Sequence, residues 1–213
     1  MTEQRYTLVD VCWTLFYSNT TFDFLDFAVK DERYIRLRQI GKSWLGRKMN
    51  LLAYKLTHVD KERARCLQYL KGKSQTELQA LAEQFYQEYL LPRRIEPVWQ
   101  ELDGKRLVIV SGTLDIIAQT VARHLGAEAY HATEMVYHDN LFTGMFRDFL
   151  LGKADVLPQY SDFDIITDNL TDIDLVRHAR NATIITYNNK RRWLDALPIG
   201  TNATFIDAEQ PRY

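Results

Sequence analysis

The sequence predicts an α/β fold in which a doubly wound parallel sheet carries an inserted helical cap. In the C-terminal half of the chain, short β-rich apolar runs alternate with helical patterns, as in parallel sheets with right-handed crossovers. A further apolar run, residues 6–11, stands alone near the N-terminus. The block that follows it, from Thr21 to about Gln100, has helical spacing and is too long for a crossover. We therefore expect a core domain of residues 1–15 and 101–213 and a helical cap of residues 16–100.

Helix signals define the elements of the predicted cap. Thr21 and Asp23 indicate a helix start. The sequence Ser74-Gln-Thr-Glu77 is typical of a capping box and opens a long amphipathic helix. Pro92 and Pro97 mark the end of this region.

The remaining elements follow from short β-rich runs and from helical periodicity. Strands are predicted over residues 106–110, 127–130, 163–167, 183–187 and 204–206, and helices over 114–125, 153–157, 171–180 and 190–197. Residues 135–144 predict a β-hairpin with Asp139-Asn140 at its turn.

Composition excludes several functional classes. The chain has 213 residues, 46% of them hydrophobic, and a net charge of −1, so no global attraction to nucleic acid or to anionic membranes is expected. Cys12 and Cys66 are the two cysteines and form no CxxC pair, which excludes a disulfide framework and a zinc site of that type. Free thiols, with no signal peptide and no long apolar run, predict a cytoplasmic protein. The oligomeric state stays open.

Basic side chains crowd one part of the predicted cap. They are Lys30, Arg33, Arg36, Arg38, Lys42, Arg47, Lys48, Lys55, Lys61, Arg63, Arg65, Lys71 and Lys73. A solvated helical face is the simpler interpretation. The alternative is a surface that attracts an anionic substrate or partner.

Asp10 directly follows the first predicted strand, at the edge where open α/β sheets bind ligands. A carboxylate at this place can attack phosphorus and form an acyl phosphate, which water then hydrolyses. The alternative role is a loop aspartate that caps a turn.

Two later segments supply groups that could bind an anion. Ser111, Gly112 and Thr113 follow the strand predicted over 106–110, where a hydroxyl and free N–H groups at a helix N-terminus would hold a phosphate. Lys153, after Gly152, could neutralise the nucleophile and a phosphate oxygen. An ordinary helix N-cap and a surface lysine are the alternatives.

Acidic residues end a third predicted strand. Asp168 could hold Mg²⁺, a hard cation that prefers oxygen ligands. Asp172, four residues later, would orient Lys153 or a metal-bound water. The alternative is helix capping by Asp168 or Asn169.

In this order, Asp10, Ser111, Lys153 and Asp168 with Asp172 resemble the motifs of the haloacid dehalogenase-like (HAD) superfamily. Residues 107–117, 122–126 and 139–144 are similar to its phosphoserine-phosphatase-like branch. That branch has a Rossmann-like core and a helical cap between the first two motifs. The resemblance implies Mg²⁺-dependent hydrolysis of a small phosphomonoester through an aspartyl-phosphate.

The resemblance also implies a role for each matched residue. The catalytic residues would be Asp10, as nucleophile, with Ser111 and Lys153. The substrate-binding residues would be Ser111, Gly112 and Lys153, which bind the phosphate, and Thr14, which also helps to orient the first loop. Asp10, Asp168 and the backbone carbonyl of Cys12 would be the Mg²⁺ ligands, with Asn169 and Asp172 as supporting residues.

The chain departs from the family pattern at two positions. Phosphatases of this family carry Asp-x-Asp-Gly-Thr, whereas this chain has Asp10-Val-Cys12-Trp13-Thr14. A thiol with an ordinary pKa of about 8.5 is a poor acid–base catalyst, which predicts a weakened phosphatase. The alternative is a weak or inactive member that binds a phosphorylated ligand or a protein.

Two other chemistries fit the sequence less well. Dehalogenases of the superfamily also lack the second aspartate, but they use no Mg²⁺, and the Asp168/Asp172 pair favours a cation. Catalysis by cysteine is disfavoured because no arginine closely follows Cys12 or Cys66. Phe16, Tyr17, Trp44 and the basic segment are candidate substrate contacts, with ordinary packing as the alternative for the aromatic residues.

Overall fold

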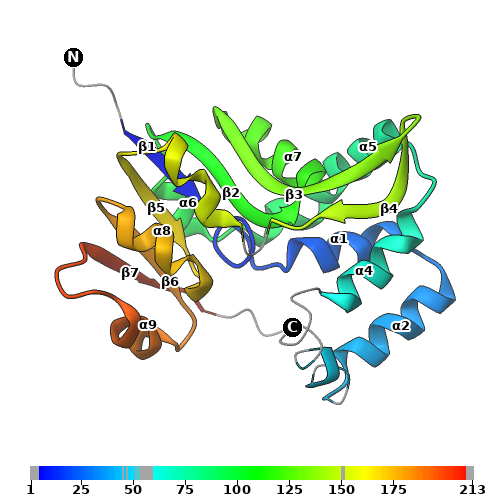
Figure 1. Cartoon of the computed structure of the whole chain (residues 1–213), viewed down its shortest axis with the longest axis horizontal. Coiled ribbons are helices and arrows are strands. Elements are labelled where there is room, and N and C mark those ends of the chain that lie inside the picture. The colour runs from blue at the N-terminus through cyan, green and yellow to red at the C-terminus, as the bar shows by residue number, and fades with distance from the viewer. Residues whose placement is uncertain are drawn as a thin grey trace.

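A seven-stranded sheet forms the centre of the protein (Figure 1), as seen in a computed structural model that describes residues 5–44, 46, 48–50, 52, 60–149 and 152–209. The strands are β1 (Tyr6–Val9), β2 (Arg106–Leu114), β3 (Ala129–His138), β4 (Leu141–Arg147), β5 (Phe163–Thr167), β6 (Ala182–Thr186) and β7 (Ala203–Asp207). Their order is β4-β3-β2-β1-β5-β6-β7, and every neighbouring pair is parallel except β3 and β4. The predicted α/β fold with a doubly wound sheet is confirmed.

Helices and short helical turns connect these strands. The α-helices are α1 (Thr20–Ala28), α2 (Glu32–Lys42), α4 (Lys61–Leu67), α5 (Gln75–Phe85), α6 (Glu96–Gln100), α7 (Asp115–Leu125), α8 (Ile173–His178) and α9 (Lys190–Ala196). The 3₁₀ turns include η1 (Gln68–Leu70), η4 (Lys153–Gln159) and η5 (Leu170–Asp172), and a π turn over Tyr86–Leu90 follows α5. None of the described helices is long and apolar enough to cross a membrane.

Both faces of the central strands are buried. Leu8 and Val9 of β1 are neighbours in sequence, so their side chains lie on opposite faces of the sheet. Each is fully buried, and the two belong to different apolar clusters. A strand buried on both faces cannot hold a charge cheaply along its length, so polar groups belong at its end.

Helix starts agree with the sequence signals to within two residues. Ser74 caps α5, where its hydroxyl accepts a hydrogen bond from the Glu77 N–H at 3.1 Å. The start predicted near Thr21 lies slightly earlier, because Asn19 is the cap of α1 and accepts from the Phe22 N–H.

The region after α7 differs from the expectation. A short strand over 127–130 and a separate hairpin were predicted, but β3 is one continuous strand that pairs with β2 on one side and β4 on the other. The predicted turn is confirmed: Asp139 and Asn140 have φ angles of 49° and 64°, as a type I′ hairpin requires.

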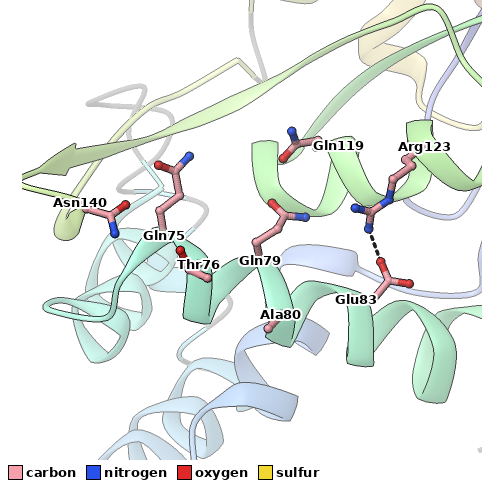
Figure 2. A pocket seen from close by; sticks show the side chains of 8 residues that line it. All are labelled: Gln75, Thr76, Gln79, Ala80, Glu83, Gln119, Arg123 and Asn140. Carbon is pink, nitrogen blue, oxygen red and sulfur yellow. Dashed lines mark hydrogen bonds and ion pairs between the residues drawn. The ribbon is translucent and has the colours of Figure 1, made fainter.

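Part of the inserted segment, residues 16–100, packs against the elements around the sheet. Helix α5 lies along α7, as Figure 2 shows, and Gln79 Nε2 donates to Thr120 Oγ1 at 2.8 Å. Helices α2 and α4 lie at the far side of the molecule from β7 (Figure 1). The division of the chain into a core and a cap at residues 16–100 stays a prediction.

The β3–β4 hairpin also holds the inserted segment, and this contact can be tested at Gly144. Gly144 has a φ of +85°, its carbonyl accepts from Gln68 Nε2 at 2.8 Å, and a Cβ there would lie 2.6 Å from Gln68 Oε1. Gly200 has a similar φ of +90° with no atom close to an added Cβ. We expect Gly144→Ala to lower the free energy of unfolding by about 1 kcal/mol more than Gly200→Ala, because only the former disturbs a hydrogen bond. Urea unfolding measures the free energy of unfolding of both variants. Equal losses would show that the hydrogen bond between Gln68 and Gly144 does not help to hold the inserted segment.

Candidate active site

Polar residues gather where the three central strands end. Asp10 follows β1, Ser111 lies near the end of β2, and Asp168 follows β5. Because β2, β1 and β5 are adjacent and parallel, these ends meet at one edge of the sheet. A cavity of about 200 Å³ opens there, lined by Asp10, Cys12, Trp13, Asn19, Thr21, Phe22, Asp60, Arg63, Ser111, Gly112, Lys153, Asp168 and Asn169.

A buried ion triad forms the floor of this site. Lys153 Nζ lies 2.8 Å from Asp10 Oδ2 and 2.9 Å from Asp172 Oδ2, and all three side chains are at most 5% exposed. Burial alone would lower the pKa of Lys153, but the two carboxylates outweigh it and raise the pKa. The ammonium is therefore charged at neutral pH. Thr167 completes the arrangement by donating its hydroxyl proton to Asp172 Oδ2 at 2.7 Å.

Thr14 joins the loop after β1 to the end of β5. Its hydroxyl donates to Asp168 Oδ1 at 3.0 Å and accepts from the Asp168 N–H at 3.0 Å. The loop makes a tight turn in which the Leu15 N–H donates to the Val11 carbonyl at 3.0 Å. Thr14 is fully buried and is not among the described residues that line the cavity, so its contacts support the orienting role and not direct substrate contact.

The position of Ser111 corrects one expectation. Ser111, Gly112 and Thr113 do not begin a helix, because β2 continues to Leu114 and α7 begins at Asp115. A shift in pairing with β3 between Val110 and Leu114 accompanies this extension. Ser111 and Gly112 still line the cavity, and they do so from an irregular strand end.

Asp168 and Asn169 lie on the opposite side of Asp10 from Ser111, at the end of β5. The pKa of Asp168 is raised by burial and by the charge of Asp10. Asn169 caps the turn η5 by accepting from the Thr171 N–H at 3.1 Å. Burial likewise raises the pKa of Asp172, although Lys153 opposes that effect.

These carboxylates bear on whether a metal ion fits. With all three carboxyl groups ionised, Asp10, Asp168 and Asp172 against one ammonium, Lys153, give a formal charge of −2 in a largely buried site, and this mutual repulsion contributes to the raised pKa of Asp168. Across the described parts of the chain, no cluster of three or more His, Cys, Asp or Glu side chains is arranged to hold a metal. Mg²⁺ needs only one or two carboxylates, with water and phosphate as its other ligands, so Asp10 and Asp168 fit that ion.

Cys12 takes part in a short hydrogen-bonded chain. Its Sγ lies 2.9 Å from Thr20 Oγ1, which lies 2.6 Å from Thr113 Oγ1. Burial and the charge of Asp10 raise the pKa of the thiol to about 11. At neutral pH the thiol is protonated, so it cannot accept a proton as a general base.

The inserted segment supplies residues that the sequence did not single out. Arg63 of α4 reaches the core, where its guanidinium contacts Thr133 Oγ1 at 2.7 Å and Asp148 at 3.2 Å. Asp60 caps the same helix by accepting from the Arg63 N–H at 3.0 Å. In sequence Arg63 is one of many cations, and only the fold distinguishes it from the rest.

The aromatic candidates lie elsewhere. Phe16 is buried against Tyr86 and Trp99, and Tyr17 packs on Tyr187. Trp44 is 66% exposed, with Lys48 over its ring. None of these candidates is among the described residues that line the cavity, so the packing interpretation holds for Phe16 and Tyr17.

Much of the basic segment has structural partners. Arg38 pairs with Asp26 and Glu62, and Lys42 also pairs with Asp26. Arg47 and Lys55 lie outside the described residues. Of this segment, the described residue that lines the cavity is Arg63.

A larger hollow of about 630 Å³ lies between α5, α7 and the hairpin turn (Figure 2). Carboxamides dominate its lining, which comprises Gln75, Thr76, Gln79, Ala80, Glu83, Gln119, Arg123 and Asn140. Its one acidic lining residue, Glu83, is paired with Arg123 and His124. Size alone would select this hollow, but the smaller cavity is the one lined by Asp10, Lys153 and Asp168 at the ends of the central strands.

The protonation of the Cys12 thiol can be tested by alkylation. In a Cys66→Ala variant at pH 8, we expect iodoacetamide to modify Cys12 roughly a hundredfold more slowly in the folded protein than in urea, because the thiolate is the nucleophile and the raised pKa suppresses it. Mass spectrometry against time gives both rates. Equal rates would show that the thiol has an ordinary pKa.

The chain is similar to known proteins in both sequence and fold. The haloacid dehalogenase-like hydrolase family matches residues 8–175, whereas no curated protein matches the chain. A solved protein of unknown function from Bordetella pertussis Tohama I has a TM-score of 0.69 at 18% identity, over 95% of this chain and 98% of its own. A phosphoserine phosphohydrolase-like protein from Francisella tularensis subsp. tularensis SCHU S4 has a TM-score of 0.59 at 14% identity, over 94% and 95%.

A substrate-bound phosphoserine phosphatase has a TM-score of 0.52 at 13% identity, over 87% of each chain. At such identities the likeness concerns the fold, and it confirms the predicted resemblance to the phosphoserine-phosphatase-like branch at that level. The family match covers most of the chain, including the first loop, the end of β2, Lys153 and the end of β5. This chain belongs to the haloacid dehalogenase-like hydrolase family.

Proposed function

We propose that this protein is a Mg²⁺-dependent phosphatase that hydrolyses a small phosphomonoester through an aspartyl-phosphate on Asp10. The observation that carries the proposal is the buried Lys153 ammonium held between Asp10 and Asp172 at the ends of the central strands. A lysine fixed beside a carboxylate nucleophile suits the transfer of a dianionic group.

In the first step, an oxygen of the Asp10 carboxylate attacks phosphorus and the ester P–O bond breaks. Lys153, Ser111 and Gly112 line the cavity around the place where the phosphoryl group would sit, so they would neutralise and position its oxygens. In the second step, water attacks the acyl phosphate, releases inorganic phosphate and restores the carboxylate.

Asp10, Asp168 and the backbone carbonyl of Cys12 are the proposed Mg²⁺ ligands, with Asn169 and Asp172 in support. The excess negative charge of the site supports this assignment. When bound, the ion would supply positive charge that lets the carboxylate approach the phosphate dianion. Thr14 holds Asp168 in place through its two hydrogen bonds.

Cys12 limits the proposed reaction at the leaving group. A carboxylic acid at this position would protonate the departing oxygen and then activate water. The Cys12 thiol, with its pKa raised to about 11, is a poor proton donor to the departing oxygen and, being protonated, cannot activate water. Esters with good leaving groups should therefore be the better substrates.

The inserted segment would set the choice of substrate. Asp60, Arg63 and Phe22 bring a carboxylate, a guanidinium and an aromatic ring to the cavity, and the volume of about 200 Å³ suits a small ligand. We propose residues 16–100 as a cap that closes over the substrate and excludes water. A cytoplasmic location stays a prediction from the free thiols.

A second candidate function is a binder of phosphorylated ligands with little or no turnover. The observation that favours it is the first loop, where the Cys12 thiol cannot act as a base and the bulky Trp13 lines the cavity. The phosphate-facing groups would be the same in both cases, so turnover separates the two functions.

Turnover of p-nitrophenyl phosphate tests the proposed nucleophile. We expect Mg²⁺-dependent hydrolysis that Asp10→Asn lowers by at least about a thousandfold, because the amide is not a nucleophile. Asp139→Asn, at the exposed hairpin turn, is the matched control and should keep full activity. Phosphate binding without hydrolysis in the unmodified protein would favour the binder.

Restoring an acid at residue 12 tests the cause of weak activity. We expect Cys12→Asp to raise kcat by about a hundredfold for esters with poor leaving groups, and less for p-nitrophenyl phosphate, since general acid–base catalysis is worth that order. Cys12→Ser is the control for loss of the thiol alone. An unchanged kcat in the aspartate variant would show that another step limits the reaction.

A further inference from the structure

Trp13 has a backbone conformation that is unusual for its residue type. Its φ is 55°, in the left-handed region that bulky side chains rarely adopt and that glycine adopts freely. The residue stands in the first loop, between Cys12 and Thr14. The backbone of this loop is therefore suited to glycine, yet it carries the largest side chain. Strain of this kind is concentrated at functional sites.

Contacts with Tyr187 hold Trp13 in place. The Tyr187 hydroxyl donates to the Trp13 carbonyl at 2.6 Å, and the two rings meet edge to face with centroids 5.9 Å apart. The Trp13 N–H donates to the Ser18 carbonyl at 3.3 Å. Both polar groups of the Trp13 backbone thus have partners, so the strained conformation is fixed by its surroundings. Trp13 is half-buried and is one of the residues that line the cavity.

The same cavity has a second aromatic wall. Phe22 of α1 lines it, and the Arg38 guanidinium lies over the Phe22 ring, 4.2 Å from its centroid. Lys153, Asp10 and Ser111 line the cavity as well. One small cavity therefore combines a phosphate-binding floor with two aromatic side chains. A ligand that matches it has a compact anionic group and an apolar surface close to that group.

We propose that Trp13 is a specificity residue that stacks on a flat ring in the organic part of the substrate, so that the substrate class is phosphomonoesters of ring-bearing alcohols. This inference rests on the proposed phosphatase site, because it places the ring beside the phosphoryl group on Asp10 and Lys153. An indole offers a large rigid face at low entropic cost, and ring stacking adds affinity beyond simple burial. This gain in binding affinity would offset the strain of holding a tryptophan in a backbone conformation that favours glycine.

Binding of non-hydrolysable phosphonates tests the inference without requiring turnover. Benzylphosphonate carries a flat ring, cyclohexylmethylphosphonate a puckered one, and ethylphosphonate neither. In calorimetric titrations with Mg²⁺, we expect the unmodified protein to bind the benzyl compound at least about fivefold more tightly than either of the others. Trp13→Gly should remove that preference and leave the dissociation constant of ethylphosphonate within about twofold.

Three further variants complete the design. Trp13→Asn also lacks the ring and tolerates the left-handed conformation, so it replaces the glycine variant if that protein does not fold. Trp13→Phe should retain most of the preference. Trp44→Ala removes an exposed tryptophan outside the cavity and should bind like the unmodified protein.

Equal binding of the flat and puckered rings, or a benzyl preference that survives loss of the indole, would overturn the inference. Failure of the proposed function has a different signature. In that case p-nitrophenyl phosphate is not hydrolysed, or none of the phosphonates competes with inorganic phosphate for the Lys153 site.

Discussion

The buried ammonium of Lys153 is the constraint on which the rest of the site depends. It lies between two carboxylates, Asp10 after β1 and Asp172 in η5, and so joins segments that are far apart in the chain. Without it, two carboxylates would face each other in a site that water hardly reaches, and a buried charge left without its partner is strongly destabilising. The same contact that stabilises this edge of the sheet also holds Asp10, the proposed nucleophile, in a defined orientation.

The loop after β1 is arranged around this triad by a second set of polar contacts. Thr14 exchanges two hydrogen bonds with Asp168, and Cys12 is joined to Thr20 at the start of α1. A movement of α1 would therefore displace the Cys12 side chain through its contact with Thr20. The loop also carries Trp13 in a strained conformation. The proposed nucleophile, the proposed specificity residue and the threonine that joins the loop to β5 thus all lie within residues 10–14.

Local signals were enough to predict much of the fold and the site. Apolar runs located β1, β5 and β6, the capping box located α5, and Asp139-Asn140 located the hairpin turn, because each depends on neighbours in sequence. Asp10 and Asp168 could be placed because they end strands, and for Lys153 the resemblance favoured a role in the site over the alternative of a surface lysine. Longer-range effects were missed. The extension of β2 past Ser111 depends on its pairing with β3, and nothing in a run of cations marks Arg63 as the one that reaches Thr133 and Asp148.

The central claim is that Asp10 becomes covalently phosphorylated beside Lys153. Acid quenching of the protein during its first turnover of p-nitrophenyl phosphate with Mg²⁺, followed by mass spectrometry of the peptide that contains Asp10, tests it most directly. We predict one phosphoryl group on Asp10 that disappears as inorganic phosphate is released. Release of phosphate with Asp10 unmodified throughout, or with the phosphoryl group on another side chain, would contradict the account.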